Sequence, residues 1–237
     1  METPKLVVEA FESGLTVESV IVPNDMHPEP EIAMACEETR TKLFSLDADA
    51  YAKLADSKSP QPALAVVEAP ALAVGERFGD NGSAMYLVLV DVADPGNVGT
   101  LIRTAEASGC AGVLVTSETA DVLSPKVVRS SAGSMLRMPI GEVSRAEIGS
   151  VLADMNALSV ATTMDGVPYG DWSAEPGARI ALLLGSEAHG VGEDLTDSSD
   201  VTLSIPMHGE VESLNVATAG AVLAFGVSPR LEGLTSS

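Results

Sequence analysis

The sequence predicts an α/β protein in which a small first unit precedes a larger unit with a mostly parallel sheet. Short apolar segments of strand length alternate with segments of helical periodicity along the 237 residues, which is the pattern of α/β folds. Residues 76–83 are rich in glycine and polar residues and predict a linker. The following segment, residues 86–92, is almost wholly apolar, as expected for a parallel strand covered on both faces. We therefore expect one unit at residues 1–75 and a second at residues 84–232.

The first unit is expected to be a compact arrangement of three helices and three strands. Apolar residues recur at helical spacing before Gly14, and glycine is a common residue at a helix end. Asp47 is suited to cap the third helix. In chain order, the expected helices span residues 5–14, 30–42 and 47–56, and the expected strands span residues 17–23, 42–46 and 63–70.

The second unit continues the alternation of strands and helices. Asp94, Pro95 and Gly96 are expected to form a turn, and Pro125 stands early in a predicted helix, where proline is favoured. The expected strands span residues 86–92, 112–117, 138–143, 157–164, 179–185 and 201–207, and the expected helices span residues 100–109, 124–135, 146–156 and 213–227.

Composition argues against several classes of protein. Apolar residues make up 46% of the chain, enough for a substantial core, so the chain is not expected to be disordered. It contains no uncharged apolar run of about 18 residues, and its first residues lack the basic and apolar parts of a secretory signal. Cys36 and Cys110 have no metal or redox spacing and are expected to be buried thiols. We expect a cytoplasmic protein without a membrane span.

The formal net charge of −21 argues against a surface that attracts nucleic acid everywhere. Overall charge bears on solubility and long-range steering, however, and does not decide the chemistry of a local site. Four basic residues fall within one stretch of the second unit, so a local positive surface is compatible with the sequence. They are Arg103, Lys126, Arg129 and Arg137.

Three strand ends carry polar residues, and ligands of open α/β sheets bind at the carboxyl ends of strands. At the first of these ends, Asn97 and Gly99 are expected to leave the backbone accessible, and Arg103 follows one helical turn later. At the second, Gly185 and Glu187 come directly after a buried strand. The third is a loop that leads to a helix beginning near Ser213, Leu214 and Asn215.

Each of these strand ends also has a purely structural interpretation. Asn97 can shape a turn, Glu187 can balance a helix N-terminus, and Ser213 can cap a helix. The sequence contains no glycine-rich dinucleotide loop and no phosphate-binding loop motif. The occurrence of all three strand ends in this order is what favours a functional site.

Together, residues 94–109, 182–192 and 205–225 resemble the three motifs of the SpoU (TrmH-like) family of RNA methyltransferases, which belongs to the SPOUT superfamily. The similarity extends over residues 85–227 and keeps the order and spacing of the motifs. It implies an α/β domain whose C-terminal segment threads a deep trefoil knot and forms the methyl-donor pocket. It also implies a homodimer with an active site completed near the subunit interface.

The implied reaction is S-adenosylmethionine (AdoMet)-dependent methylation of a ribose 2′-hydroxyl in RNA. An N-terminal accessory domain is commoner in family members that act on large-subunit rRNA, which favours rRNA over tRNA as the partner. The motif positions assign the AdoMet pocket to Thr162, Gly185, Ile205, Met207 and Leu214. They assign the polar catalytic face to Asn97, Arg103, Glu187, Ser213 and Asn215. Arg129 and Arg103 are expected to contact RNA, and no metal ligand is expected.

Residues 4–14 and 54–68 resemble, more loosely, a ribosomal-protein-like substrate-binding domain that precedes the catalytic domain in several family members. Such domains usually begin with a strand, whereas this chain begins almost at the first helix, so we expect a unit shortened at its N-terminus.

Two roles remain open for Arg103. Family proposals make the corresponding arginine the base that deprotonates the ribose hydroxyl. Arginine stays protonated in proteins, so we favour a role in which Arg103 holds the adjacent phosphate and lowers the pKa of the hydroxyl electrostatically. Asn97 and Glu187 would orient the guanidinium.

Two other classes of function remain alternatives. One is a protein that keeps AdoMet and RNA binding but has weak or no turnover. The other is a hydrolase that uses Ser186, His189 or His208, although the sequence lacks the G-x-S-x-G motif of a nucleophile elbow.

Overall fold

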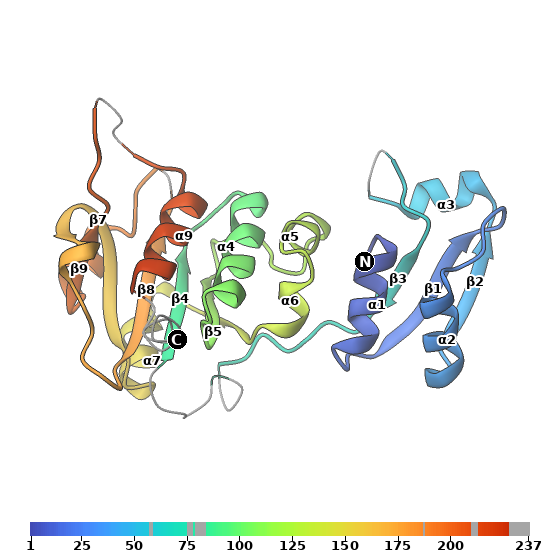
Figure 1. Cartoon of the computed structure of the whole chain (residues 1–237), viewed down its shortest axis with the longest axis horizontal. Helices are drawn as coiled ribbons and strands as arrows, with labels where there is room; N and C mark the ends of the chain where they lie inside the picture. Colours follow the sequence, from blue (N-terminus) through green and yellow to red (C-terminus); the bar gives the residue numbers. More distant parts are fainter. Residues whose placement is uncertain (57–58, 75–77, 79–83, 187, 210–212, 228–237) are drawn as a thin grey trace, which may run out of the picture.

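A computed structural model describes residues 1–56, 59–74, 78, 84–186, 188–209 and 213–227. Two units lie side by side, each built on its own sheet (Figure 1). The smaller unit has the strand order β2-β1-β3, in which β1 (Val17–Pro23) runs parallel to β2 (Lys42–Leu46) and antiparallel to β3 (Leu64–Val67). Its helices are α1 (Pro4–Glu12), α2 (Pro30–Thr39) and α3 (Ala48–Leu54).

Local sequence explains where the helices of the smaller unit begin. The hydroxyl of Thr3 accepts a hydrogen bond from the backbone N–H of Leu6, and Pro4 fits the first position of α1. Asp47 caps α3 as expected and accepts from the backbone N–H of Ala50 at 2.9 Å. Each helix and strand expected in this unit is present, with bounds that differ by a few residues.

The larger unit contains a six-stranded sheet with the order β6-β5-β4-β8-β7-β9, and every pairing of neighbouring strands is parallel. The strands are β4 (Ala84–Val90), β5 (Gly112–Thr116), β6 (Ile140–Val143), β7 (Leu158–Pro168), β8 (Arg179–Gly185) and β9 (Val201–Ser204). The helices are α4 (Pro95–Ala107), α5 (Pro125–Ser130), α6 (Ser134–Arg137), α7 (Ile148–Asp154), α8 (Glu193–Ser198) and α9 (Val216–Val227), with short 3-10 turns η2 (Arg145–Glu147) and η3 (Tyr169–Asp171).

Strand β4 shows why this sheet needs helices on both faces. All its residues are buried, and successive side chains point to opposite faces. Leu87 and Leu89 belong to the core that includes buried side chains of α4 and α9, whereas Tyr86 and Val88 belong to the core that includes buried side chains of α7 and α8. The expectation of a parallel sheet covered on both faces is confirmed.

Two expectations for the helices were wrong. The segment Asp94–Gly96 is not a separate turn, because Asp94 caps α4 by accepting from the backbone N–H of Asn97 at 2.9 Å and Pro95 begins the helix. The helix expected at residues 124–135 is divided into α5 and α6. Between them Ala132 and Gly133 have left-handed φ angles of 49° and 87°, which end an α-helix.

Phe78, within the expected linker, is buried at 3% exposure and stacks on Tyr86 with ring centroids 6.0 Å apart. The Tyr86 hydroxyl donates a hydrogen bond to the Phe78 carbonyl at 2.8 Å. The same aromatic ring lies where a side chain at Gly112 would otherwise extend. Phe78 is therefore part of the core on one face of the larger sheet.

Ion pairs join the two units where α1 faces α5 and α6 (Figure 1). Arg137 is placed between Glu9 of α1, at 3.4 Å, and Glu106 of α4, at 2.6 Å. The side-chain pair of Arg137 and Glu106 is bidentate, and it holds the pKa of the Glu106 carboxyl below its usual value. We call this boundary, formed by the ion pairs of Arg129 and Arg137, the interdomain seam.

Candidate cofactor-binding and catalytic site

The strand order of the larger sheet changes direction between β4 and β8. Strands β5 and β6 lie on one side of this point, and β7 and β9 lie on the other. In an open parallel sheet, a change of this kind leaves a crevice at the carboxyl ends of the strands. The segments that follow β4 and β8, which carry the predicted polar residues, therefore meet at the upper edge of the sheet in Figure 1.

A cavity of about 490 Å³ opens at this edge, a volume typical of sites that bind a small molecule, roughly 300–1,000 Å³. Apolar side chains from several elements line it, among them Leu184, Leu203 and Leu223. Each residue that the sequence assigned to the AdoMet pocket lines this one cavity, namely Thr162, Gly185, Ile205, Met207 and Leu214. The fold thus brings together residues from four different segments.

The loop after β8 closes one side of the cavity, and its backbone lies tightly packed. A Cβ atom at Gly185 would lie 1.9 Å from the backbone carbon and oxygen of Gly190. The backbone N–H of Gly190 donates to the carbonyl of Ser186 at 2.8 Å, which folds the loop back on itself. Gly190 and Gly192 have φ angles of 60° and 92°, a region that favours glycine. The glycines are therefore needed for the shape of the cavity wall.

Asn97 and Asn215 join the starts of two helices beside this cavity. The Asn215 side-chain N–H donates to the side-chain oxygen Oδ1 of Asn97 at 3.0 Å. The Asn215 oxygen accepts from the backbone N–H groups of Ala217 and Thr218, so Asn215 also caps α9. Because Ser213 lines the cavity two residues earlier, this hydrogen bond connects the cavity wall to α4.

One of the predicted catalytic residues, Arg103, takes no part in these side-chain contacts. Arg103 is exposed on α4, six residues after Asn97, which corresponds to roughly 9 Å along the helix axis. In the part of the chain that the structure describes, no hydrogen bond or ion pair involves the side chain of Arg103. Glu187 lies outside the described residues. The catalytic assignment of both side chains stays a prediction.

Gly99 has a different function from the expected one. A Cβ atom at this position would lie 1.9 Å from the Ser130 hydroxyl and 2.7 Å from the Val127 carbonyl oxygen. The glycine therefore allows α5 to pack closely on α4 and does not leave the backbone accessible. This close packing holds α4, the helix that carries Asn97 and Arg103, in position against α5.

Asp94 adds a local negative charge at the start of α4. The hydrogen bond from the backbone N–H of Asn97 keeps the pKa of the Asp94 carboxyl below its usual value, and Lys126 contributes with an ion pair at 3.3 Å. The carboxylate therefore stays ionised and keeps the first turn of α4, with Asn97, in place.

The geometry does not support a hydrolase. Ser186 and His189 both line the cavity, but the contact between them runs from the backbone N–H of His189 to the Ser186 hydroxyl at 3.3 Å. A nucleophile–base pair needs the imidazole nitrogen in that position. His208 is not among the residues that line the cavity.

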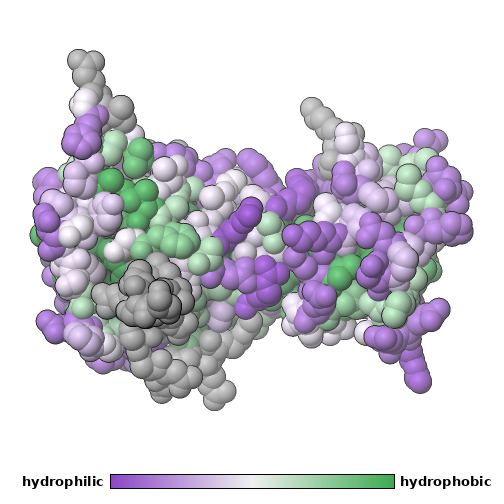
Figure 2. Space-filling view, in the orientation of Figure 1, coloured by the Kyte–Doolittle hydropathy of each residue, from purple (hydrophilic) through white to green (hydrophobic). Residues whose placement is uncertain are grey.

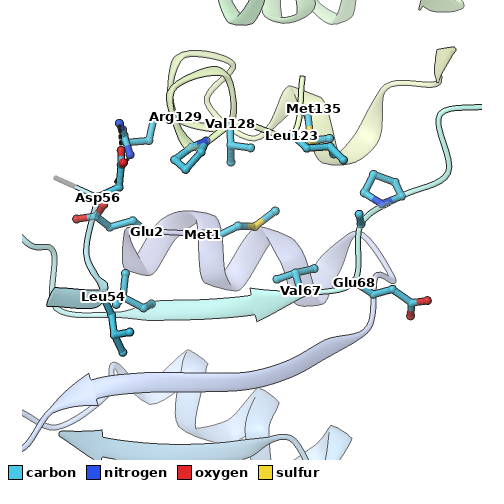
Figure 3. A pocket seen from close by; sticks show the side chains of 14 residues that line it. Met1, Glu2, Leu54, Asp56, Val67, Glu68, Leu123, Val128, Arg129 and Met135 are labelled. Carbon is cyan, nitrogen blue, oxygen red and sulfur yellow. Dashed lines mark ion pairs between the residues drawn. The ribbon is translucent and has the colours of Figure 1, made fainter. Parts of the chain in front are cut away.

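Arg129, the predicted RNA contact, lies in the interdomain seam, at a crevice of about 230 Å³ that is separate from the cavity lined by Gly185. Figure 3 shows it reaching from α5 toward Asp56 and Glu2 of the smaller unit. Its guanidinium nitrogens lie 2.7 Å from an Asp56 oxygen and 3.7 Å from a Glu2 oxygen. A phosphate that binds Arg129 would have to compete with these carboxylates.

Sequence reasoning missed Arg145, which contacts the loop after β8. Its guanidinium donates to the Val191 carbonyl at 2.7 Å and to Asp194 and Asp91. No motif marks Arg145, because its partners lie 46 to 54 residues away along the chain. Only the tertiary structure, which brings these separate strand ends together, reveals its contacts.

The described parts of the chain contain no group of three or more His, Cys, Asp or Glu side chains that could hold a metal ion. They also contain no helix with the length and apolarity needed to cross a membrane.

Comparison with known proteins identifies the class. The SpoU rRNA Methylase family model matches residues 84–225. The 23S rRNA (guanosine(2553)-2′-O)-methyltransferase RlmP of Bacillus subtilis (strain 168) is 32% identical over 230 residues, which cover 95% of this chain and 86% of that protein. The 23S rRNA (uridine(2479)-2′-O)-methyltransferase of Streptomyces viridochromogenes is 32% identical over 205 residues, which cover 84% of this chain and 71% of that protein.

Solved structures agree with this result. The SpoU methyltransferase AviRb from Streptomyces viridochromogenes, in complex with AdoMet, superposes with a TM-score of 0.88 at 26% identity, over 98% of this chain and 89% of that chain. The AdoMet-bound rRNA methyltransferase from Sinorhizobium meliloti superposes with a TM-score of 0.85 at 26% identity, over 98% of this chain and 86% of that chain.

The open parallel sheet, the cavity at its switch point and these similarities define an AdoMet-dependent RNA methyltransferase. The chain belongs to the SpoU rRNA methylase family. The resemblance carried by the three segments is therefore confirmed.

Proposed function

We propose that this enzyme transfers the methyl group of AdoMet to a ribose 2′-hydroxyl of large-subunit rRNA. The observation that carries the proposal is the convergence of the five expected pocket residues on one cavity, beside Ser213 and the Asn97–Asn215 pair. The names of the two relatives, both 23S rRNA 2′-O-methyltransferases, support rRNA over tRNA.

The cavity has the properties that AdoMet requires. It combines apolar side chains such as Ile205 and Leu214 with the polar backbone of the loop at Gly190–Gly192, which suits a nucleoside with a polar tail. When bound, AdoMet supplies a methyl group that is already activated by the positive charge of its sulfonium. The side chains of the protein then have to align the ribose hydroxyl and assist its loss of a proton.

We assign the alignment to the polar residues beside the cavity. The Asn97–Asn215 hydrogen bond and the cap on α9 hold both amides in fixed positions before RNA arrives. Ser213, two residues before Asn215, lines the cavity. Arg103 would hold the adjacent phosphate and stabilise the developing alkoxide, and Glu187 would orient the guanidinium.

Substitutions at Arg103 distinguish charge from geometry. If only a positive charge is needed, Arg103→Lys retains part of the activity, and if the planar fork is required, Arg103→Lys is as inactive as Arg103→Ala. Both variants should bind AdoMet like the wild type, as measured by calorimetry without RNA. Full methyl transfer by Arg103→Ala would disprove both roles.

We further propose a homodimer in which a second copy completes the site. Helix α9 contains no charged residue, and Phe225 on its outer side is 47% exposed. A hydrophobic patch lies over α9 and the adjoining edge of the larger unit in Figure 2. Because α9 packs on α4, a partner that covers this patch would approach the exposed face that carries Arg103. Light scattering of the wild type and of Phe225→Glu tests the dimer, which the charge should dissociate.

We assign residues 1–75 to substrate binding, with residues 76–83 as the linker, and residues 84–232, including the expected knot, to methyl transfer. Arg129 would contact RNA phosphate once the substrate displaces its carboxylate partners. Since rRNA is the proposed substrate, we place the enzyme in the cytoplasm.

Transfer of labelled methyl from AdoMet tests the reaction. The purified protein is incubated with large-subunit rRNA or with tRNA, and the nucleosides of each RNA are analysed by mass spectrometry. We expect a single 2′-O-methylated nucleoside from rRNA. AdoMet binding without transfer to either RNA would favour a protein that only binds, and label in a base would contradict the proposed acceptor.

A further inference from the structure

Arg145 connects the carboxyl ends of several strands through one guanidinium group. From η2, which follows β6, its Nη1 donates to Asp91 after β4 at 2.9 Å. Its Nε and Nη2 form a two-point contact with Asp194 of α8, at 3.0 and 2.5 Å, and Nη2 also donates to the Val191 carbonyl at 2.7 Å. A planar guanidinium can serve these acceptors together, because its N–H groups have a fixed arrangement.

The acceptors of Arg145 are themselves held in place. Asp91 has a left-handed φ of 55°, and its carboxylate accepts from the Thr116 hydroxyl at 2.7 Å, which fixes it to the end of β5. Both carboxylate oxygens of Asp194 accept hydrogen bonds from the guanidinium. These hydrogen bonds hold the pKa of the Asp194 carboxyl below its usual value. The network is therefore anchored on the end of β5 through Thr116, and the Asp194 carboxylate stays ionised at neutral pH.

The remaining contact of Arg145 is with the wall of the AdoMet cavity. Val191 and Gly192 both line the cavity, whereas Arg145 does not. A Cβ atom at Gly192 would lie 2.2 Å from Nη2 of Arg145, so the guanidinium packs directly on the Gly192 backbone. Arg145 thus contacts the segment Gly190–Gly192 without lining the cavity itself.

We propose that Arg145 is a positioning residue that holds Gly190–Gly192 in the conformation that binds AdoMet. This inference rests on the proposed placement of AdoMet in the cavity. Without the guanidinium, Asp91 and Asp194 carry uncompensated charges and the Val191 carbonyl loses its donor. Binding of AdoMet would then include the entropic cost of ordering the glycine-rich segment.

The test measures the affinity of the purified full-length protein for AdoMet by calorimetry, without RNA. We expect Arg145→Gln to weaken binding by roughly tenfold, the equivalent of ordering one further residue. Arg145→Lys should recover only part of the loss, because one ammonium cannot serve Asp91, Asp194 and Val191 together. In methyl-transfer assays, the KM for AdoMet should rise while kcat at saturating AdoMet stays close to the wild-type value.

Arg137→Gln is the matched control. Like Arg145, Arg137 is partly exposed and makes a two-point contact with a carboxylate, that of Glu106, but Arg137 lies in the interdomain seam. Its AdoMet affinity should equal that of the wild type. If Arg145→Gln does not fold, Asp194→Asn tests the same contact from an exposed side chain and should also weaken AdoMet binding. Wild-type affinity in folded Arg145→Gln or Asp194→Asn would overturn the inference alone, whereas failure of the wild type to bind AdoMet would overturn the proposed function as well.

Discussion

At the scale of single residues, Asn215 uses the two ends of its side-chain amide for different purposes. The oxygen caps α9, and the N–H group donates to Asn97. Asn215→Ser keeps a capping oxygen but cannot reach Asn97, so stability should stay close to the wild type while methyl transfer falls at least about tenfold. Asn215→Ala should show the same loss of activity and lose about 1 kcal/mol of stability. Chemical denaturation and single-turnover assays check these values, and a fully active Asn215→Ser would contradict the alignment role.

Two helical glycines provide a matched pair for packing. Gly99→Ala places a methyl group against the Val127 carbonyl and the Ser130 side chain, and we expect a loss of about 1–3 kcal/mol. Gly149→Ala, in the exposed part of α7 with no atom within 4 Å of its Cβ, should gain about 0.5–1 kcal/mol. Denaturant titration of both variants measures the difference. Equal stabilities would mean that α4 and α5 can separate at no cost.

The residues predicted for the AdoMet pocket could be chosen from the sequence because a short motif marks each strand end. Gly185, Ile205 and Leu214 follow or lie beside apolar strands, and the fold brings them to one cavity. Arg145 was not predictable, since an arginine in a polar loop resembles any solvated surface residue. The sequence singled out Gly99 but not its role in packing, because the sequence does not show that the backbone of α5 approaches it.

At the scale of elements, Asp200 fastens the start of β9 to the start of β7. Its carboxylate accepts from the backbone N–H of Ser159 at 2.8 Å and from the Ser159 hydroxyl at 2.7 Å. These hydrogen bonds, that of the hydroxyl first, lower the pKa of the Asp200 carboxyl from 3.8. A lowered pKa stabilises the fold above the ordinary carboxyl pKa, and this contribution disappears as the pH falls through the folded-state pKa.

We therefore expect wild-type protein to lose more stability between pH 6 and pH 3 than Asp200→Asn, by at most about 1 kcal/mol because the carboxylate is exposed. Denaturant titrations across this pH range measure the difference. Asp165→Asn, on the exposed part of β7, is the control and should follow the wild type. A difference between wild type and Asp200→Asn that is constant with pH would contradict the link to ionisation.

The elements themselves were largely predictable from alternation and capping residues. Strands such as β4 and β8 are continuous apolar runs, and α3 begins at an expected cap. The division of residues 124–135 into α5 and α6 was not predictable, because their sequence is compatible with one helix. Packing against the smaller unit favours the break, since Gly133 leaves room for Glu9 of α1.

At the scale of the whole molecule, the interdomain seam shows where some of the many acidic residues act: they pair with arginines between the two units. Carboxylates of the smaller unit neutralise Arg129 and Arg137 of an already acidic chain. If Arg129 contacts RNA as proposed, Asp56 competes with phosphate for it. Asp56→Asn should therefore raise the affinity for an rRNA fragment several-fold, and Arg129→Ala should lower it and reduce its salt dependence.

Filter binding at several salt concentrations measures both effects. Lys5→Ala is the control, because Lys5 is highly exposed and pairs only weakly, at 3.8 Å, with Glu9. Unchanged affinity in both Asp56→Asn and Arg129→Ala would show that the seam is purely structural.

The sequence by itself determined the α/β alternation, the cap of α3 at Asp47 and the family, because these depend on local periodicity and on short motifs. Only the tertiary structure decided the strand order β6-β5-β4-β8-β7-β9, which creates the cavity between distant segments. It also decided that Arg145 supports the cavity loop and that Arg129 faces carboxylates. These contacts join residues far apart in the chain, and their energies depend on distances that no local pattern encodes.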